Sequence, residues 1–98
     1  MPELNIAEIP YENGKIRFRY SRYMSGDGLR WVRHGLFRAY HENGALASEG
    51  AYVDGVEHGP WRDFHDNGQL AADGQYDHGR EVDAWKYWNK DGSESPGT

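Results

Sequence analysis

The sequence contains no cysteine, so it can form no disulfide framework and offers no thiolate for catalysis or metal binding. It has no run of about 18 apolar residues, and we expect no membrane-spanning helix. Its first residues carry neither the basic start nor the apolar stretch of a signal peptide. We therefore expect a cytoplasmic protein.

Aliphatic residues are also scarce. Leu, Ile, Val and Phe together number 15 of 98 residues, a fraction that indicates disorder when the net charge is large. The formal net charge is only −5, and the chain has four Trp and seven Tyr, each able to bury roughly 150–250 Å². We therefore expect one small domain whose order depends on aromatic packing.

Basic residues are few in the second part of the chain. Residues 1–41 carry seven Lys or Arg and four acids, whereas residues 42–98 carry four and twelve. The two parts thus have net charges of +3 and −8. This asymmetry says little about the fold, but it can orient a charged partner.

What the chain does contain is a repeat of 24 residues. Residues 34–57 are followed without a gap by their second copy, 58–81, and residues 82–92 form a half copy. The recurring structural positions are Phe37, Tyr40, Gly44, Gly50 and Tyr52, then Trp61, Phe64, Gly68, Gly74 and Tyr76, and finally Trp85. A fixed period of this length is typical of stacked supersecondary units, each of which needs its neighbour to bury its apolar face.

Each copy carries the turn signals of a β-hairpin. Asn43-Gly44 and Asn67-Gly68 separate two runs of strand-forming residues, and Asn13-Gly14 and Asp91-Gly92 take the same place in the outer copies. A second turn signal, such as Asp54-Gly55, ends each full copy. We therefore predict an all-β fold of consecutive antiparallel hairpins, forming one elongated, curved, single-layer sheet.

The ends of the chain depart from the period. Gly14 and Gly44 are 30 residues apart, six more than the repeat, so residues 11–33 form an irregular first unit with a turn at Asp27-Gly28. We predict a repeat domain over residues 11–92, an N-terminal tail over 1–10 and a C-terminal tail over 93–98.

The recurring glycine inside the returning strand predicts a particular core. Because such a glycine is costly in a strand, an aromatic ring from a neighbouring strand is expected to cover it, with Phe37, Trp61 and Trp85 as the candidate rings. The aromatic residue three positions after each ring belongs on the opposite face unless a bulge rotates it. The sequence leaves that point open.

The pattern G-x-W-x-x-Y/F-x-x-N-G-x-L-x-x-x-G-x-Y-x-x-G resembles the MORN repeat, in the variant common in bacterial proteins of the YwqK antitoxin family. The resemblance covers residues 34–81 well, and Asp83 stands where both full copies have glycine. It implies hairpins stacked into an elongated sheet and no enzymatic activity of the repeat itself. Related repeats in larger proteins are associated with protein contacts and with phospholipid head groups.

Residues that suggest catalysis or metal binding have a simpler interpretation. The histidines at equivalent positions, such as His41 and His65, fall on different units without a cysteine or tight carboxylate cluster, so we expect no metal and no cofactor. The acids of the second copy fit turns and solvated faces, and no serine lies in a nucleophile motif. We therefore predict that the chain is not an enzyme.

The strongest candidate site is the basic first hairpin. Its candidate contact residues for a partner or an anion are Arg17, Arg19, Arg22, Arg30, Trp31 and Arg33. The alternative is a solvated strand face whose arginines keep an edge soluble. We expect a non-catalytic module that binds a protein partner, with an antitoxin or inhibitor acting by occlusion as one form of this function. Alternatives are an anionic-ligand binder for phospholipid head groups or nucleic acid, which the net acidity disfavours, and a self-associating structural ribbon.

Overall fold

The computed structural model describes residues 3–96, and all regular structure in that range is β-strand. No helix that could cross a membrane occurs among these residues. The strands are β1 (Asn5–Pro10), β2 (Ile16–Met24), β3 (Trp31–Tyr40), β4 (Leu46–Val53), β5 (Val56–Glu57), β6 (Gly59–Phe64), β7 (Leu70–Asp77), β8 (Arg80–Trp88) and β9 (Glu94–Ser95).

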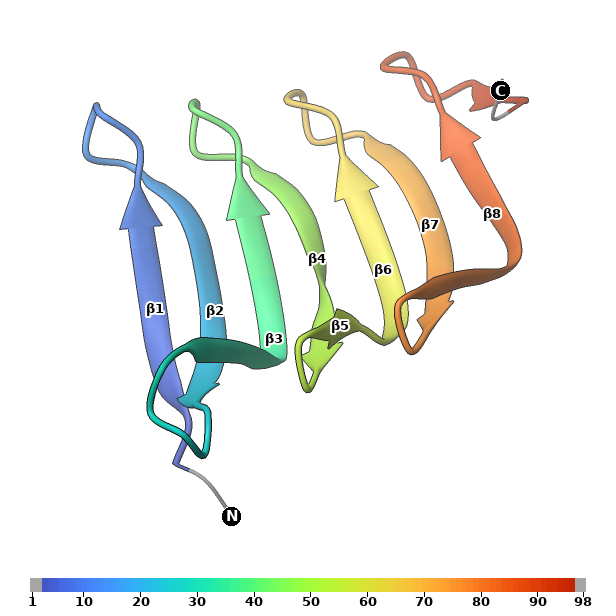
Figure 1. The fold of residues 1–98 in the computed structure, drawn as a ribbon. Coiled ribbons are helices and arrows are strands. Elements are labelled where there is room, and N and C mark those ends of the chain that lie inside the picture. The colour runs from blue at the N-terminus through green and yellow to red at the C-terminus, as the bar shows by residue number, and fades with distance from the viewer. Residues whose placement is uncertain (1–2, 97–98) are drawn as a thin grey trace.

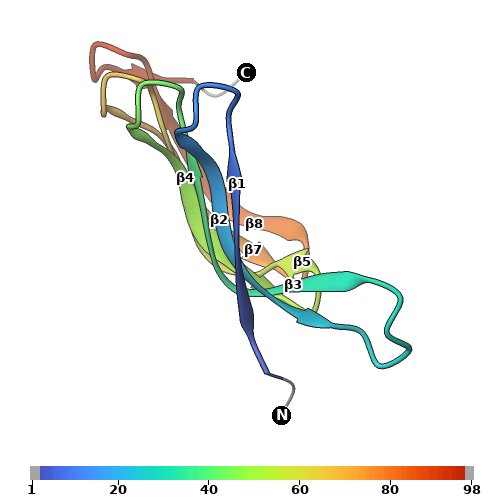
Figure 2. The ribbon, with the colours of Figure 1, turned by 90° about the vertical axis from the view of Figure 1, so that its left-hand side faces the viewer.

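The strands form one open antiparallel sheet, in which neighbours in sequence are neighbours in space (Figure 1). The order is β1-β2-β3-β4-β6-β7-β8-β9, with the short β5 paired to β4. The Cα radius of gyration is 15.0 Å, whereas a compact chain of this length would have about 12.6 Å. The predicted elongated, single-layer hairpin sheet is therefore confirmed, and the sheet is bent rather than flat (Figure 2).

The Asn-Gly turns share one geometry along one end of the sheet. In the turn of the first full copy, Gly44 donates its N–H to the carbonyl of His41 at 2.9 Å, and His41 donates to Ala45 at 2.8 Å. Gly44 has φ of 91°, which favours glycine, whereas Asn43 instead uses its side-chain oxygen to accept the N–H of Ala45 at 2.9 Å. The same backbone bonds recur at the turns around Gly14, Gly68 and Gly92.

A register shift beside three of these four turns bears on the point that the sequence left open. The pairing slips between Asp63 and Phe64, so that Phe64 lies opposite Leu70. The extra residue, Ala71, lies in β7, so the alternation along β6 is intact and Phe64 falls on the face away from Trp61. The equivalent Tyr40 agrees, because it lies beside Arg19 and Arg38, on the face away from Phe37.

The core consists of aromatic rings laid over bare backbone. A Cβ built on Gly50 would lie 2.3 Å from Cε2 of Trp61, and one on Gly74 would lie 2.1 Å from Cδ2 of Trp85. Both indoles therefore cover the glycine of the preceding hairpin, as predicted. Phe37 differs, because it lies opposite Tyr20 at a ring distance of 6.1 Å.

These rings form a ladder along the sheet. Adjacent ring centroids are 5.4 Å apart for Phe37 and Tyr52, 5.8 Å for Tyr52 and Trp61, 5.6 Å for Trp61 and Tyr76, and 5.1 Å for Tyr76 and Trp85, all with steep interplanar angles. Edge-to-face pairs of this kind contribute about 0.5–1.5 kcal/mol each beyond the area they bury. Each hairpin therefore shares its core with the next one.

The predicted tails need correction. Asn5–Pro10 forms strand β1, which pairs with β2 and buries Ala7 opposite Tyr20. Because this strand carries Ala7 where the later copies carry an aromatic ring, no repeat signal marks it in the sequence. At the other end Glu94–Ser95 forms β9 against β8. Residues 1–2 and 97–98 of the predicted tails lie outside the described residues.

Candidate functional site

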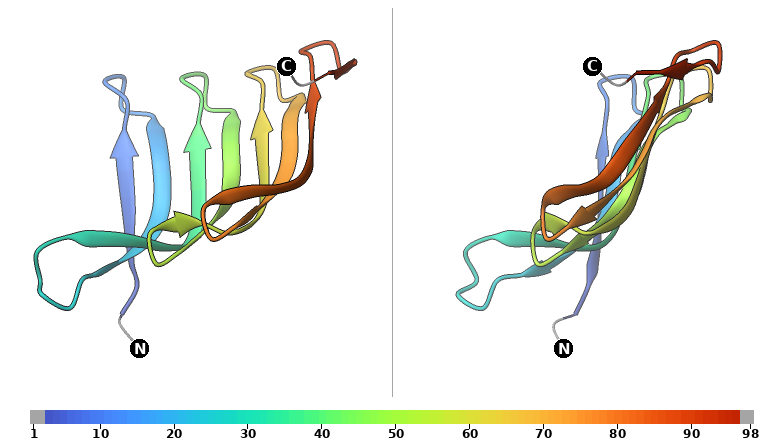
Figure 3. Two further views of the ribbon diagram at one scale, coloured as in Figure 1. Left: turned by 45° about the vertical axis from the view of Figure 1, so that its right-hand side comes forward. Right: turned by 90° about the vertical axis from the view of Figure 1, so that its right-hand side faces the viewer.

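The hairpin of β2 and β3 projects beyond the neighbouring turns at its end of the sheet (Figure 2 and Figure 3). Its tip is a six-residue turn in which Ser25 donates its N–H to the carbonyl of Arg30 at 2.9 Å. Asp27 accepts bonds from the Ser25 hydroxyl and from the Leu29 N–H, and these bonds, the first most strongly, lower the pKa of its carboxyl group. The projecting tip is therefore an ordered turn.

The tip of this hairpin exposes apolar side chains. Leu29 is 83% exposed, Trp31 46% and Met24 40%, and Arg30 lies exposed between the first two in sequence. Shallow hollows flank Trp31, one shared with Leu4 and Met24 and the other reaching Tyr52 on β4. A large ring between two hollows offers contact area to a partner.

Two arginines at the base of this hairpin stack on aromatic rings. Arg22 lies opposite Arg33 in the strand register, where like charges repel. The guanidinium of Arg22 lies 3.9 Å from the Trp31 ring centroid, and that of Arg33 lies 4.8 Å from the Tyr20 ring and donates to the Tyr52 hydroxyl at 3.3 Å. Attraction to the ring faces therefore offsets the repulsion between the two guanidinium groups and holds both side chains in place.

The hairpin is also tied to the next turn of the sheet. Tyr23 donates its hydroxyl to Asp54 at 2.8 Å. This hydrogen bond, followed by desolvation, raises the pKa of Tyr23. The orientation of the projecting hairpin relative to the repeat units is thus specified by a contact between neighbouring units.

The six candidate residues of the sequence analysis separate into two groups. Arg22, Arg30, Trp31 and Arg33 lie on the projecting hairpin. Arg17 lies five residues, or roughly 16 Å, further along β2 from Arg22, and its guanidinium is 4.9 Å from the Phe18 ring. Arg19 pairs with Glu8 at 3.6 Å on the edge strand. Arg17 and Arg19 are therefore not part of the projecting surface.

A row of charged side chains crosses the other face of the sheet. Register pairs join Glu8, Arg19, Arg38, Glu49, Arg62, Asp73 and Lys86 in this order. Arg38 binds Glu49 at 3.0 Å, and this hydrogen bond raises the pKa of Arg38. The row makes this face polar and solvated, whereas the opposite face is aromatic. This row is not visible in the sequence, because the period alone does not give the pairing between units.

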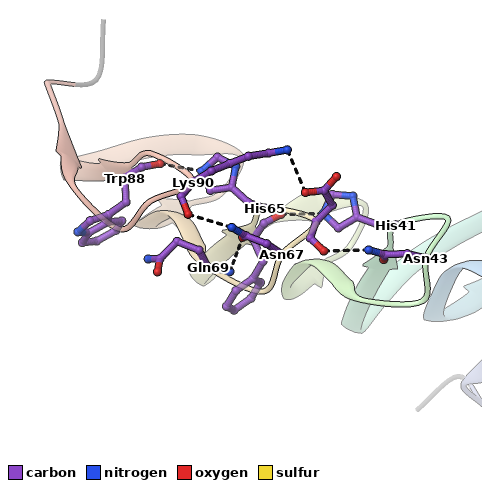
Figure 4. A network of polar contacts seen from close by, with 9 residues as sticks. His41, Asn43, His65, Asn67, Gln69, Trp88 and Lys90 are labelled. Carbon is purple, nitrogen blue, oxygen red and sulfur yellow. Dashed lines mark hydrogen bonds and ion pairs between the residues drawn. The ribbon is translucent and has the colours of Figure 1, made fainter.

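At the Asn-Gly end, the repeated histidines connect neighbouring units (Figure 4). His41 and His65 are half-buried, and Nε2 of each donates to the carbonyl of the aromatic residue one unit ahead, Phe64 or Trp88, at 2.8 Å. Asn43 and Asn67 make parallel bonds from their side-chain amide groups to the backbone carbonyls of Asp66 and Lys90. These residues therefore join the units, which is a more specific role than the repeated surface position that the period indicated.

No charged or polar side chain among residues 3–96 is buried. The acids of the second copy take part in exposed or half-buried contacts, such as Asp66 with Lys90 at 3.0 Å and Asp63 with Ser48 at 2.6 Å. Lys90 is the main cause of the lowered pKa of Asp66. Ion pairs and hydrogen bonds of the fold account for these groups without an acid–base role.

The comparisons with known proteins agree with the repeat geometry. No curated protein and no solved structure matched the chain. The family model of the MORN repeat variant matches twice, at residues 33–54 and 57–78. The MORN repeat is a non-enzymatic module associated with binding or structural roles. The two matched segments contain most of the β3–β4 hairpin and all of the β6–β7 hairpin, so the similarity to the MORN repeat variant covers these two hairpins.

Proposed function

We propose that this chain is a non-catalytic repeat module that binds a protein partner through the projecting β2–β3 hairpin. The observation that carries the proposal is the exposed Trp31, backed by the Arg22 guanidinium at 3.9 Å and flanked by Leu29 and Met24. Trp and Arg are the residues most enriched among binding hot spots, and a large exposed ring is costly to leave in water. The two matches to a repeat associated with binding or structural roles are compatible with this class of function.

The surrounding contacts favour tight docking of this hairpin. Binding costs conformational entropy when loose side chains and loops become ordered. Here the stack of Arg22 on Trp31, the bond from Tyr23 to Asp54 and the bonds to Asp27 order the hairpin in advance. The charge difference between residues 1–41 and 42–98 would orient the partner during encounter.

The form of this function that we propose is inhibition by occlusion. A projecting hairpin on a broad, ordered sheet can enter a cleft of the partner while the sheet blocks access around it. The resemblance of the repeat to that of YwqK-family antitoxins is compatible with this role, with the partner as the toxin. The occluded protein would present an acidic rim to Arg30 and an apolar pocket to Trp31.

An anionic ligand is the weaker candidate. Three of the arginines offered by the sequence are occupied by contacts within the chain, Arg19 with Glu8, Arg17 with Phe18 and Arg33 with Tyr52. Binding to phosphate groups depends on several unpaired cations acting together and falls steeply with salt. A protein surface needs only the central ring and its rim.

Site-specific photo-crosslinking in cells that express the chain naturally tests this proposal. A photoreactive phenylalanine derivative replaces Leu29 at the hairpin tip or, as a control, the exposed Lys86 on the charged face of β8. We expect one discrete adduct with another protein at position 29 and none at position 86. Equal adducts at both positions, or no protein adduct at position 29, would refute docking through the hairpin. An adduct only with a second copy of the chain would favour the structural ribbon instead.

A further inference from the structure

A cluster of three metal-ligating side chains lies at the turn between β7 and β8, far along the sheet from the projecting hairpin. It consists of His58, Asp77 and His78, whose ligand atoms all lie within 4.8 Å of one another. It is the one group of three or more such residues found among residues 3–96. The first histidine precedes β6, Asp77 ends β7 and His78 begins the turn, so the fold brings together positions about 20 apart in sequence.

Backbone contacts hold the turn against the segment that carries His58. Gly79 donates its N–H to the carbonyl of Glu57 at 2.7 Å, and His78 donates its N–H to Nδ1 of His58 at 3.2 Å. The φ angles of His78 and Gly79, 49° and 87°, are those of a tight two-residue hairpin turn. As a result the two imidazole rings lie 4.7 Å apart.

The distances within the cluster bracket those of a tetrahedral site. Metal bonds of about 2.0–2.1 Å place two ligand atoms about 3.3 Å apart. The Asp77 carboxylate oxygen lies 2.6 Å from Nδ1 of His78 and 3.9 Å from Nδ1 of His58. All three side chains are at least 39% exposed, so small rotations can equalise these distances. When Nδ1 of His58 binds the ion, it no longer accepts the N–H of His78. A water molecule can then accept this exposed N–H instead.

We propose that His58, Asp77 and His78 bind a divalent transition-metal ion, with water in the remaining coordination positions. Two imidazoles and one carboxylate suit zinc, nickel or copper, whereas calcium and magnesium prefer sets of oxygen ligands. The sequence predicted no metal site, because histidines at equivalent positions fall on different copies of the repeat. The proposed ligands instead join the two ends of one copy, residues 58–81, and the ion would hold its last turn to its first strand.

The preceding copy provides an internal comparison. At the three equivalent positions it carries His34, Val53 and Asp54, and its turn has nearly the same conformation, with φ of 48° at Asp54 and 93° at Gly55. His34 accepts the N–H of Asp54 at 3.1 Å, as His58 does with His78. The backbone of the turn therefore forms without the second histidine and with valine in place of Asp77. A chain that carries Asp77→Val and His78→Asp should fold normally.

Calorimetric titration of the full, untagged chain with zinc chloride tests the proposal. We expect the titration to show one zinc ion per chain. NMR spectra should show amide chemical shifts that change at residues 58 and 77–79, and thermal denaturation should show a higher Tm when zinc is present. The Asp77→Val, His78→Asp double variant should bind at least about tenfold more weakly, because the Asp77 carboxylate is lost and one of the two imidazoles is replaced by a carboxylate. His34→Gln, which removes the equivalent imidazole of the preceding copy, should bind as the wild type does.

Three results would overturn the proposal. If zinc does not bind at millimolar concentration, the proposed site does not exist. Equal zinc affinity in the double variant would place the ion elsewhere. Equally tight binding of calcium chloride would indicate a general attraction to the acidic part of the chain rather than a histidine site.

Discussion

The central packing contact of the fold is the approach of Trp61 to Gly50, and Gly50→Ala perturbs it with one methyl group. The added carbon would lie 2.3 Å from Cε2 of the indole, whereas ordinary contacts begin at 3.4 Å, so the ring must move by more than about 1 Å. Phe37, Tyr52 and Tyr76 surround that ring with centroids 5.6–5.8 Å away. Overpacking of this kind costs about 1–3 kcal/mol.

Two smaller effects modify this cost. Movement of the indole weakens the bond from its Nε1 to the Ala51 carbonyl, 3.3 Å long, which contributes about 1 kcal/mol. Replacing glycine restricts the unfolded chain and returns about 0.4–1 kcal/mol. We therefore expect Gly50→Ala to lower the free energy of unfolding by about 2 kcal/mol, which corresponds to a decrease in Tm of about 8–16 °C for a domain of this size.

Urea denaturation followed by tryptophan fluorescence measures this change. Gly26→Ala is the matched control, because a Cβ there meets nothing within 4 Å and its φ is not left-handed, so its stability should change by less than about 1 kcal/mol. In the Gly50→Ala background, Trp61→Phe should restore part of the loss, because the smaller ring leaves room for the methyl group. If Gly50→Ala leaves the unfolding midpoint unchanged, the stacking of rings on bare backbone is not what couples the units.

Two further predictions follow from particular residues. Asp83 has φ of 62° at the position where Gly35 and Gly59 have 98° and 89°, so Asp83→Gly should raise the free energy of unfolding by about 0.5–1 kcal/mol, measured by urea denaturation. Desolvation, followed by Glu57 and Glu81, raises the pKa of Tyr76 above its usual 10.0. The stabilisation linked to the protonated phenol should be full below pH 10 and lost as the pH rises through the folded-state pKa, and spectrophotometric titration should show a late-titrating tyrosine.

The repeat made most of the fold predictable. Three Asn-Gly pairs and Asp91-Gly92 predicted all four turns at one end, and the strand glycines predicted the rings of Trp61 and Trp85 above them. Strand β1 was missed because Ala7 stands where later copies carry a ring, so its pairing depends on tertiary contact rather than on a local pattern. The extra residue in the returning strand was not predictable either, because a bulge is a property of two paired strands.

The candidate sites were less predictable, because they depend on where side chains end in space. The sequence indicated a cluster of arginines, but it could not show that Arg19 turns to Glu8 while Arg22 stacks on Trp31. Likewise, His58 and His78 are 20 positions apart in the sequence, and only the folded hairpin brings them into contact. In both cases the period gives the unit, and the contacts within and between units give the chemistry.

The affinity of the chain for the protein crosslinked at position 29 tests the central claim most directly. Isothermal titration calorimetry would compare the wild type, Trp31→Ala and the control Leu36→Ala, whose side chain is exposed on the charged face. We predict that Trp31→Ala weakens binding by at least about 30-fold, the loss of a hot spot worth about 2 kcal/mol, and that Leu36→Ala changes it little. Unchanged affinity in a folded Trp31→Ala variant would contradict docking through the projecting hairpin.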